Sequence, residues 1–349
     1  MKGRVVVLGS YRDREAAALM VDGRLEDLLI APAGDTGFAP GAILRGTVDR
    51  QMKGQGGVFV RLPDGEKGFL RDAGGLAPGQ ALLVQVSGRG EAGKAVPVTT
   101  RILFKSRFAI VTPQAPGLNI SRRIRDEVVR AELNALAAAA MEGCDYGLIL
   151  RSACDAAPPA DIAADIAAMR DLAVAVMADG AGAPELLMDA LTPHEEAWRD
   201  WSDPAPDEVA EGENAFAAQG VEDAVDALTL AQVDLPGGGS LVIEPTRAFV
   251  AVDVNTGADT SPAASLKANI AAARDLPRQL RLRGLGGQVI VDFAPMPKKD
   301  RATVEQQLRA AFRGEAAETV LAGWTPLGNF ELQRKRDRIA LALQLRGAR

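Results

Sequence analysis

The chain contains the run Ala248-Phe249-Val250-Ala251-Val252-Asp253-Val254-Asn255 and, further along, the run Gln288-Val289-Ile290-Val291-Asp292-Phe293. Both runs have the length and the β-branched composition of strands. The segment between them, residues 265–283, has the composition of a helix, and the glycines that follow would end it. Strand, helix and strand with short gaps predict a βαβ unit with two parallel strands.

Asp253 and Asp292 occupy corresponding positions near the ends of these two strands. Adjacent parallel strands end at the same edge of a sheet, so we expect the two carboxylates to face each other. Burying a carboxylate among Val and Ile is costly without a partner, and neither run contains Lys or Arg. Oxygen ligands supplemented by water suit Mg²⁺. The pattern therefore predicts that Asp253 and Asp292 share a Mg²⁺ ion.

The composition is that of a multidomain protein, with 349 residues of which 47% are hydrophobic. No apolar run approaches the roughly 18 residues of a membrane span, and the N-terminus does not resemble a secretory signal, so we expect a cytoplasmic protein without a membrane partner. Cys144 and Cys154 fit a reducing compartment, where we expect buried, inert thiols. His194, the single histidine, is expected in a solvated loop, which argues against sites built on catalytic histidines.

The net charge of −6 conceals two oppositely charged parts of the chain. Residues 155–226 contain 18 acidic and 2 basic residues, a charge of −16, which leaves +10 for the remainder. The basic charge is thus concentrated outside this segment, as RNA binding requires. The acidic segment is also explained by a solvated helical surface, and both readings can hold.

Residues 38–100 contain five short strand-like runs with Gly and Asp turns, the size of a small Greek-key barrel. Phe59 and Phe69 each lie beside a glycine in such a run. Exposed aromatics on a small barrel bind single-stranded nucleic acid by stacking, with basic residues nearby. The alternative is that both rings fill the barrel core.

Two further motifs concern anion binding. Residues 88–94 match a dinucleotide-type glycine pattern, but Ala95 replaces the Ser/Thr of a P-loop and no helix is expected to follow. We therefore expect a glycine-rich hairpin, in which Lys94 can still contact a phosphate. Arg122 and Arg123 lie at the expected start of a helix at about 121–142, where cations oppose the macrodipole, so their placement suggests a bound anion. An exposed arginine face is the alternative.

The remaining expectations concern the outline of the chain. Residues 1–32 read as three short strands, and residues 101–113 as a strand pair. Residues 192–212 read as a linker or long loop because of their prolines and acids. The end of the chain, about 331–345, reads as a basic helix.

Several segments resemble the signatures of the ribonuclease E/G family of bacterial endoribonucleases. They are Gly237-Gly238-Gly239-Ser240-Leu241-Val242-Ile243-Glu244-Pro245-Thr246, Ala251-Val252-Asp253-Val254-Asn255-Thr256-Gly257, Arg278-Gln279-Leu280-Arg281-Leu282-Arg283-Gly284-Leu285-Gly286-Gly287, Val291-Asp292-Phe293, Ile120-Ser121-Arg122-Arg123-Ile124, Gly147-Leu148-Ile149-Leu150-Arg151-Ser152 and Glu331-Leu332-Gln333-Arg334-Lys335-Arg336. These segments cover most of the chain in the family's order.

The resemblance implies a multidomain fold that mixes α/β and β parts. It implies an S1-type OB barrel at 38–100, a 5′-sensor region at 101–190 and a DNase I-like catalytic domain at 236–349. A reduced RNase H-like part would combine residues 1–35 with 191–235.

The resemblance also implies roles for individual residues. Asp253 and Asp292 would bind catalytic Mg²⁺, or Mn²⁺ as an alternative ion, and Asn255 would assist them. Arg151 and Ser152, with Ile110, would form the sensor for a 5′-monophosphate. Phe59, Phe69 and Lys94 would lie on the RNA path, as we also expect for Arg122 and Arg123. The implied enzyme cleaves single-stranded RNA with metal-activated water and leaves 5′-phosphate and 3′-hydroxyl ends.

The chain departs from the family's pattern in three respects. Pro295 stands where the family often has a second acid after the position of Asp292. The Cys-x-x-Cys zinc link of larger members is absent from this sequence, so we expect no zinc and a monomer or homodimer instead of a zinc-linked tetramer. The segment at 192–215 is short. A non-catalytic single-stranded RNA-binding relative is the main alternative function, and a nuclease of single-stranded DNA is another.

Overall fold

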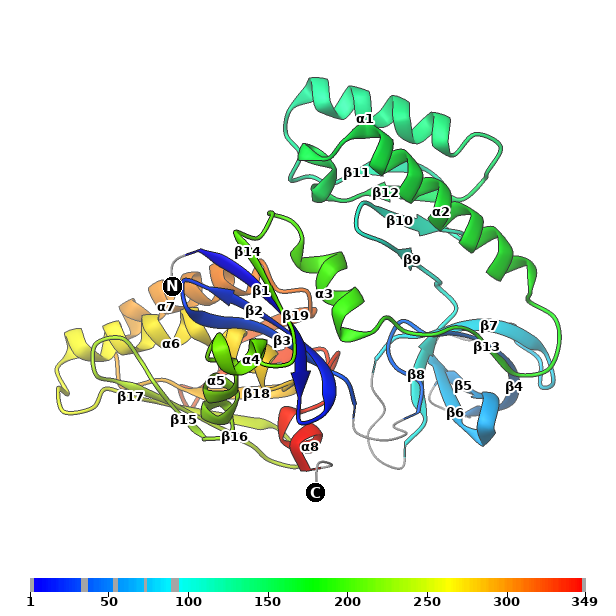
Figure 1. Cartoon of the computed structure of the whole chain (residues 1–349). Coiled ribbons are helices and arrows are strands. Elements are labelled where there is room, and N and C mark those ends of the chain that lie inside the picture. The colour runs from blue at the N-terminus through cyan, green and yellow to red at the C-terminus, as the bar shows by residue number, and fades with distance from the viewer. Residues whose placement is uncertain (1–2, 33–36, 53–55, 72–73, 89–93, 347–349) are drawn as a thin grey trace.

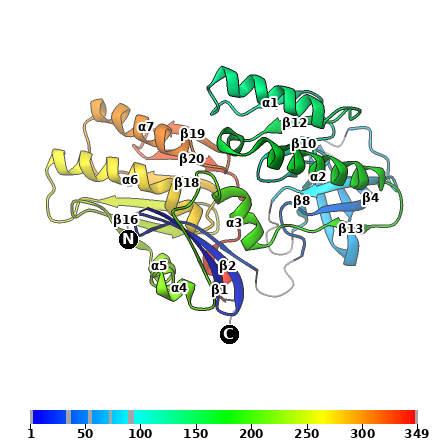
Figure 2. The same cartoon turned by 45° about the horizontal axis from the view of Figure 1, so that its top comes forward.

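The computed structural model describes residues 3–32, 37–52, 56–71, 74–88 and 94–346. The fold consists of a body that carries a six-stranded sheet, a small barrel, and a lobe of two long helices (Figures 1 and 2). Within the described ranges, no helix is both long and apolar enough to cross a membrane.

The six-stranded sheet of the body has the order β15-β16-β17-β18-β20-β19. Its strands are β15 (Gln232–Asp234), β16 (Ser240–Pro245), β17 (Val250–Asn255), β18 (Gly287–Asp292), β19 (Thr319–Trp324) and β20 (Phe330–Arg334). Only β17 and β18 pair in parallel, and α6 (Pro262–Leu282) connects them. The βαβ unit expected from the sequence is therefore confirmed, and the other pairings of this sheet are antiparallel.

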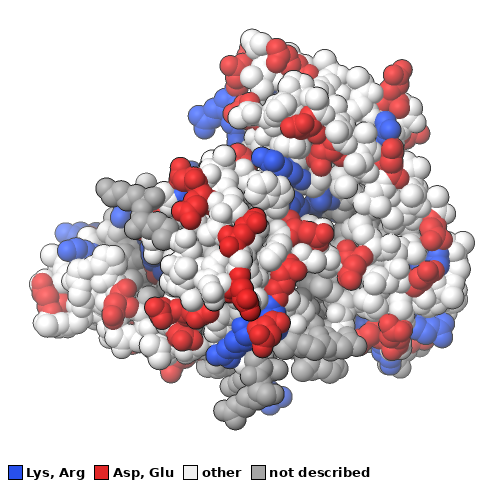
Figure 3. Space-filling model, viewed as in Figure 1, with Lys and Arg blue, Asp and Glu red and all other residues white. Residues whose placement is uncertain are grey.

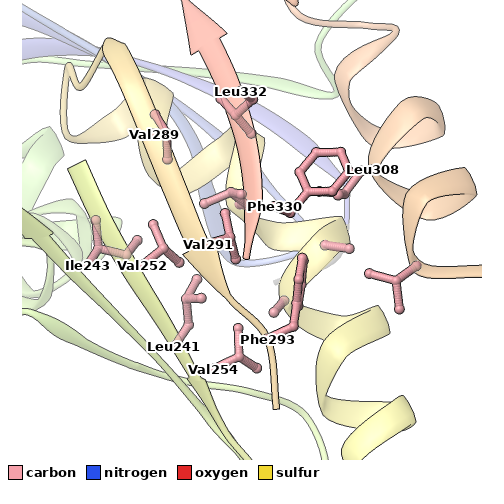
Figure 4. Close-up of a cluster of buried hydrophobic side chains, with 14 of the residues drawn as sticks. Leu241, Ile243, Val252, Val254, Val289, Val291, Phe293, Leu308, Phe330 and Leu332 are labelled. Atoms are coloured by element: carbon pink, nitrogen blue, oxygen red, sulfur yellow. The ribbon is translucent and has the colours of Figure 1, made fainter. Parts of the chain in front are cut away.

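One face of this sheet is buried by α6 and by α7 (Lys298–Phe312). Alternate strand residues such as Val252, Val254 and Val291 point to the helices and are at most 3% exposed. Figure 4 shows these valines packed with Phe330 and with Leu308 of α7. The residues between them on each strand necessarily point to the opposite, open face.

The ends of α6 follow from local chemistry. Ser261 is the N-cap, and its hydroxyl accepts a hydrogen bond from the Ala264 amide. Gly284, just beyond the helix, has φ of +62°, and a Cβ there would collide with the backbone of Ile339. A glycine is therefore required where the chain turns toward β18.

The barrel contains five strands and closes through the pairing of β4 with β7. Its strands are β4 (Ile43–Met52), β5 (Gly57–Arg61), β6 (Lys67–Arg71), β7 (Ala81–Val86) and β8 (Val96–Thr99), with a short turn of helix, η1 (Pro63–Gly65), between β5 and β6. This closed barrel fits the expected OB-type fold. A sixth strand, β13 (Glu185–Met188), adds to β4 from the end of the lobe.

The lobe packs two helices on a four-stranded sheet of order β11-β12-β10-β9. Its elements are β9 (Phe104–Lys105), β10 (Ala109–Thr112), β11 (Leu118–Ile120), α1 (Glu127–Ala140), β12 (Gly147–Leu150), η2 (Ser152–Ala156) and α2 (Pro159–Ala178). Helix α1 begins later than expected, because Asp126 caps it through the amides of Val128 and Val129. Arg122 and Arg123 thus precede the helix. The expectation that they lie in its first turn and oppose its macrodipole is therefore wrong.

A fourth sheet, of order β14-β1-β2-β3, joins the start of the chain to its middle. It contains β1 (Arg4–Tyr11), β2 (Arg14–Val21), β3 (Arg24–Ile30) and β14 (Glu208–Glu211), and it is followed in sequence by α4 (Ala215–Ala218) and α5 (Val221–Leu228). Helix α3 (Pro193–Trp201) packs on this sheet through Ala197 and Trp201.

Two sequence expectations about this part of the molecule are wrong. The supposed linker at 192–212 contains α3 and β14, and its prolines mark a helix start, since Thr192 and Glu195 form a capping box at Pro193. The supposed C-terminal helix instead contains β20, followed by the short α8 (Leu341–Arg346). Alternate residues of β20 are buried in the sheet core, so tertiary packing outweighs the helical propensity of this stretch.

Candidate functional site

Asp253 and Asp292 are direct neighbours in the register of β17 and β18. Adjacent strands lie about 4.8 Å apart, and residues in register point to the same face. Both aspartates alternate with buried valines, so their carboxylates project from the open face of the sheet, opposite α6 and α7. Their burial, which the sequence argument assumed, is not observed, since both residues are exposed.

Asn255 lies two residues beyond Asp253 on the same open face, and its Nδ2 donates a hydrogen bond of 2.8 Å to Oδ2 of Asp253. Two glycines allow the loop between β15 and β16 to approach this end of β17 closely. A Cβ on Gly239 would lie 2.6 Å from the Asn255 carbonyl oxygen, and one on Gly257, whose φ is +75°, would collide with Gly238. The glycines therefore permit the loop after β15 to pack directly against the site.

Asn269 is a positioning residue that the sequence analysis missed. It lies on α6 with no exposed surface, and its side chain both donates to the carbonyl of Ala294 and accepts from the amide of Ala294, each at 2.9 Å. It therefore fixes the chain two residues after Asp292. An asparagine on the apolar face of an alanine-rich helix was the available signal, because such a side chain needs partners. Pro295, the departure from the family pattern, follows this anchored residue and is exposed.

Phe59 and Phe69 form a cross-strand pair on β5 and β6, with ring centroids 5.7 Å apart and planes tilted by 59°. Both are half-buried, while Val58, Val60 and Leu70 on the other face of these strands fill the barrel core. The alternative that both rings fill the core is therefore wrong. A Cβ on Gly57 would lie 2.6 Å from Cζ of Phe69, so the glycine leaves room for this ring.

The other predicted RNA contacts lie on exposed segments. Arg122 and Arg123 are exposed in the turn between β11 and α1, and Lys94 is exposed just before β8. Residues 89–93 of the expected glycine-rich hairpin lie outside the described residues, although β7 and β8 are antiparallel. The structure does not bring these three cations together with the carboxylates, and their contact with RNA stays a prediction.

Arg151 and Ser152 lie together directly after β12, and Ile110 is on the neighbouring β10, paired with Ile149. The Arg151 guanidinium donates from Nη1 to the carbonyls of Ser106 (2.6 Å) and Arg199 (3.1 Å). Its Nη2 donates to the carboxylate of Asp200 at 2.8 Å. The carboxylate partner of Arg151 is thus an acid of α3.

Neither cysteine is part of these groups of residues. Cys154 is 3% exposed, and its thiol donates to the carbonyl of Phe108 at 3.3 Å. Burial raises the pKa of this thiol to about 11. His194 is not in a solvated loop but in the first turn of α3, where Nε2 lies 3.0 Å from the carbonyl oxygens of Gly9 and Ala16. Its ring is therefore engaged with the backbone of β1 and β2.

The ribonuclease E/G family model matches residues 104–210 and 207–337, which is more than half of the chain. The chain belongs to the ribonuclease E/G family, a family of endoribonucleases. It is 28% identical to ribonuclease E of Nostoc sp. over 93% of this chain and 54% of that protein. It is 30% identical to ribonuclease G of Escherichia coli over 85% of this chain and 73% of that protein. It is 27% identical to ribonuclease G of Haemophilus influenzae over 93% of this chain and 78% of that protein.

The chain thus spans about half the length of the Nostoc ribonuclease E and about three quarters of the Escherichia coli ribonuclease G. In this family member the matched region includes the lobe, α3 and the whole six-stranded sheet. The aspartate pair, Asn255, Arg151 and Ser152 all lie within it.

The aspartate pair and Asn255 fit a hard divalent cation. They present only oxygen donors besides the amide nitrogen, and they are open to solvent, as Mg²⁺ requires because it retains several waters. Within the described ranges, neither carboxylate takes part in an ion pair, and no group of three or more His, Cys, Asp and Glu residues is suited to hold a metal. A cation here would therefore have two carboxylate ligands and water.

Proposed function

We propose that this chain is a Mg²⁺-dependent endoribonuclease that cleaves single-stranded RNA at the open face of the six-stranded sheet. The observation that carries the proposal is the in-register pair of Asp253 and Asp292, exposed on one face without a cationic partner in the described part of the chain. Two like charges at this spacing repel each other unless a cation lies between them. Membership of a ribonuclease family supports RNA as the substrate.

In this proposal Asp253 and Asp292 would hold Mg²⁺, which supplies an activated water and stabilises charge on the phosphate when bound. Asn255, through its bond to Oδ2 of Asp253, restricts that carboxylate to one orientation. Asn269 acts on the other strand by fixing the backbone after Asp292. The two aspartates are thereby pre-positioned, which reduces the reorganisation needed when substrate binds.

The proposed end chemistry is supported by the residues that are available. Attack by the internal 2′-hydroxyl is usually assisted by acid–base histidines, and His194 is occupied by two backbone carbonyls on another sheet. Attack by water with departure of the 3′-oxygen leaves a 5′-phosphate on one product and a 3′-hydroxyl on the other. The open sheet face gives an extended strand access to the carboxylates without the need to open a duplex.

The grip on RNA would come from the barrel and from basic residues. Phe59 and Phe69 offer half-exposed rings for stacking on bases, and Lys94, Arg122 and Arg123 offer exposed charges for phosphates. We also propose that Arg151 and Ser152, beside Ile110, favour RNA with a 5′-monophosphate, because a guanidinium fork matches a terminal phosphate.

The proposal is tested with one unstructured RNA incubated with the protein in Mg²⁺ or in EDTA. Cleavage in Mg²⁺ only, lost in Asp253→Asn and in Asp292→Asn but retained in Glu244→Gln, is the expected result. Glu244 is an exposed acid on β16, so its variant controls for the loss of one negative charge near the site. RNA binding without cleavage by wild type would favour the non-catalytic alternative, and products with 2′,3′-cyclic phosphate would contradict the water mechanism.

A further inference from the structure

The seam between the lobe and α3 contains a cluster of cations around Asp200, and one of them, Arg199, also pairs with Glu196 of the same helix at 3.3 Å. Asp200, the penultimate residue of α3, accepts hydrogen bonds from Arg151 and from Arg199, the latter at 3.1 Å from Nε and 2.6 Å from Nη2. Lys105 interacts electrostatically with Arg151, Arg199 and Asp200, and also with Lys335. Figure 3 shows basic side chains where the lobe meets the body, with acidic side chains scattered around them.

The positive charge of this cluster is visible in its titrating groups. The pKa of Lys105 is lowered, first by desolvation in the seam and then by the charge of Arg199. Burial alone would raise the pKa of Asp200, but hydrogen bonds from Arg199 and Arg151 outweigh it and lower that pKa. Asp200 is therefore an anion at neutral pH and is held by its surroundings as an anionic ligand would be.

Arg151 does not depend on Asp200 for its orientation. Two backbone carbonyls, those of Ser106 and Arg199, already hold its Nη1. Only Nη2 is directed at the carboxylate. If Asp200 turned away, the guanidinium would remain in place with this donor directed into the seam.

Ser152 has a similar acidic partner. Its hydroxyl donates to Oδ2 of Asp203 at 3.2 Å. The two residues proposed to bind a 5′-phosphate are thus both bonded to acids of the same short segment. Helix α3 is anchored by the buried Ala197 and Trp201, so release of Asp200 requires only a change of its side-chain rotamer and no movement of the helix.

We propose that Asp200 occupies the place of a terminal phosphate and competes with it, so that Asp200 determines how strongly this chain prefers 5′-monophosphorylated RNA. Asp203 acts in the same way, and more weakly, at Ser152. The inference rests on the proposed role of Arg151 and Ser152 as the 5′-phosphate pocket. It adds that the pocket is already filled by the protein's own carboxylate, which an incoming phosphate with a larger charge must displace.

The pocket and the aspartate pair contact different parts of an RNA. Lys335 follows Arg334, which pairs with Gly287 at the start of β18, while Asp292 ends that strand. The start of β18, next to Lys335, is therefore about 17 Å from Asp292 along the strand. Changing Asp200 should alter end preference without changing the chemistry at Asp292.

The test compares the affinity of wild type and Asp200→Asn for a short RNA bearing either a 5′-monophosphate or a 5′-hydroxyl, measured in EDTA so that no cleavage occurs. The preference is measured as the Kd for the 5′-hydroxyl RNA divided by the Kd for the 5′-monophosphate RNA. This ratio should rise by about tenfold in Asp200→Asn, which is the lower end for a charge-assisted hydrogen bond made available to the ligand. Glu195→Gln is the matched control, since it removes the same charge from α3 while glutamine can keep the capping box. Its ratio should equal that of wild type.

The outcomes separate this inference from the proposed function. A ratio unchanged by Asp200→Asn, with a wild-type preference that Arg151→Ala abolishes, overturns the inference and leaves the pocket standing. A ratio of one in wild type and in every variant would show that Arg151 and Ser152 do not bind a 5′-phosphate, and it would overturn the inference as well. If Asp200→Asn lowers the melting temperature, Asp203→Asn provides the second test and should raise the ratio by a smaller factor. A fall in stability with no change of ratio in either variant would assign these acids a structural role only.

Discussion

Replacement of Phe69 by alanine tests whether the barrel binds RNA with its outer face. The ring is half-buried, is absent from the barrel core and contacts Phe59 at 5.7 Å. If bases stack on it, the variant should bind single-stranded RNA about 1–3 kcal/mol more weakly, a factor of about 5 to 150. Its stability should fall by only about 1.5–2.5 kcal/mol, from partial burial and one aromatic pair.

The adjacent Leu70 provides the control, because it lies on the same strand but points into the core and is 4% exposed. Leu70→Ala should lower the free energy of unfolding by about 2–5 kcal/mol. It should leave the RNA affinity of the folded protein nearly unchanged. We therefore expect Leu70→Ala to lower stability more than Phe69→Ala does, and Phe69→Ala to weaken RNA binding more than Leu70→Ala does.

The assay is a titration of a labelled, unstructured RNA in EDTA, beside chemical unfolding of each protein. Phe59→Ala should resemble Phe69→Ala, since the rings form one platform. The reasoning is refuted if Phe69→Ala binds RNA as wild type does, or if Leu70→Ala and Phe69→Ala lose affinity equally while both remain folded.

Two further predictions concern buried groups. Asn269→Ala should lower the free energy of unfolding by about 2–5 kcal/mol, because it leaves the buried amide and carbonyl of Ala294 without partners. Unfolding in denaturant measures this loss, and a loss below about 1 kcal/mol would contradict the positioning role. Cys154 should resist alkylation in the folded protein at pH 8, since a pKa of about 11 leaves about one thiol in a thousand ionised; mass spectrometry measures the modification, and rapid labelling of Cys154 under native conditions would show that the thiol is not buried as described.

The strands of the site could be predicted from the sequence because their pattern is local. The alternation of Asp253 and Asn255 with valines, and the helix between β17 and β18, are contained in one continuous stretch. The sequence alone could not predict that the aspartates point to the open face, because it does not show that α6 and α7 both cover the other face of the sheet. The aspartates are exposed for that reason and not buried in a shared site.

The errors have a common physical origin in long-range contacts. Helix α3 packs on strands from the start of the chain, and β14 pairs with one of them. The hydrogen bond between His194 and the carbonyl of Gly9 joins residues that are 185 positions apart. Strand β20 forms because its apolar residues complete the sheet beside β18. The partners of Arg151 could not be predicted either, since Asp200 is brought to it only by the packing of α3.

The central claim is that Asp253 and Asp292 together hold a divalent cation, and Mn²⁺ titration followed by electron paramagnetic resonance tests it without reference to activity. Wild type should bind one Mn²⁺ that Mg²⁺ displaces. Asp253→Asn and Asp292→Asn should each weaken this binding by at least about tenfold, since loss of even an outer-shell partner costs that much. Glu244→Gln should bind as wild type does. Unchanged Mn²⁺ affinity in both aspartate variants would contradict the claim and place the metal elsewhere.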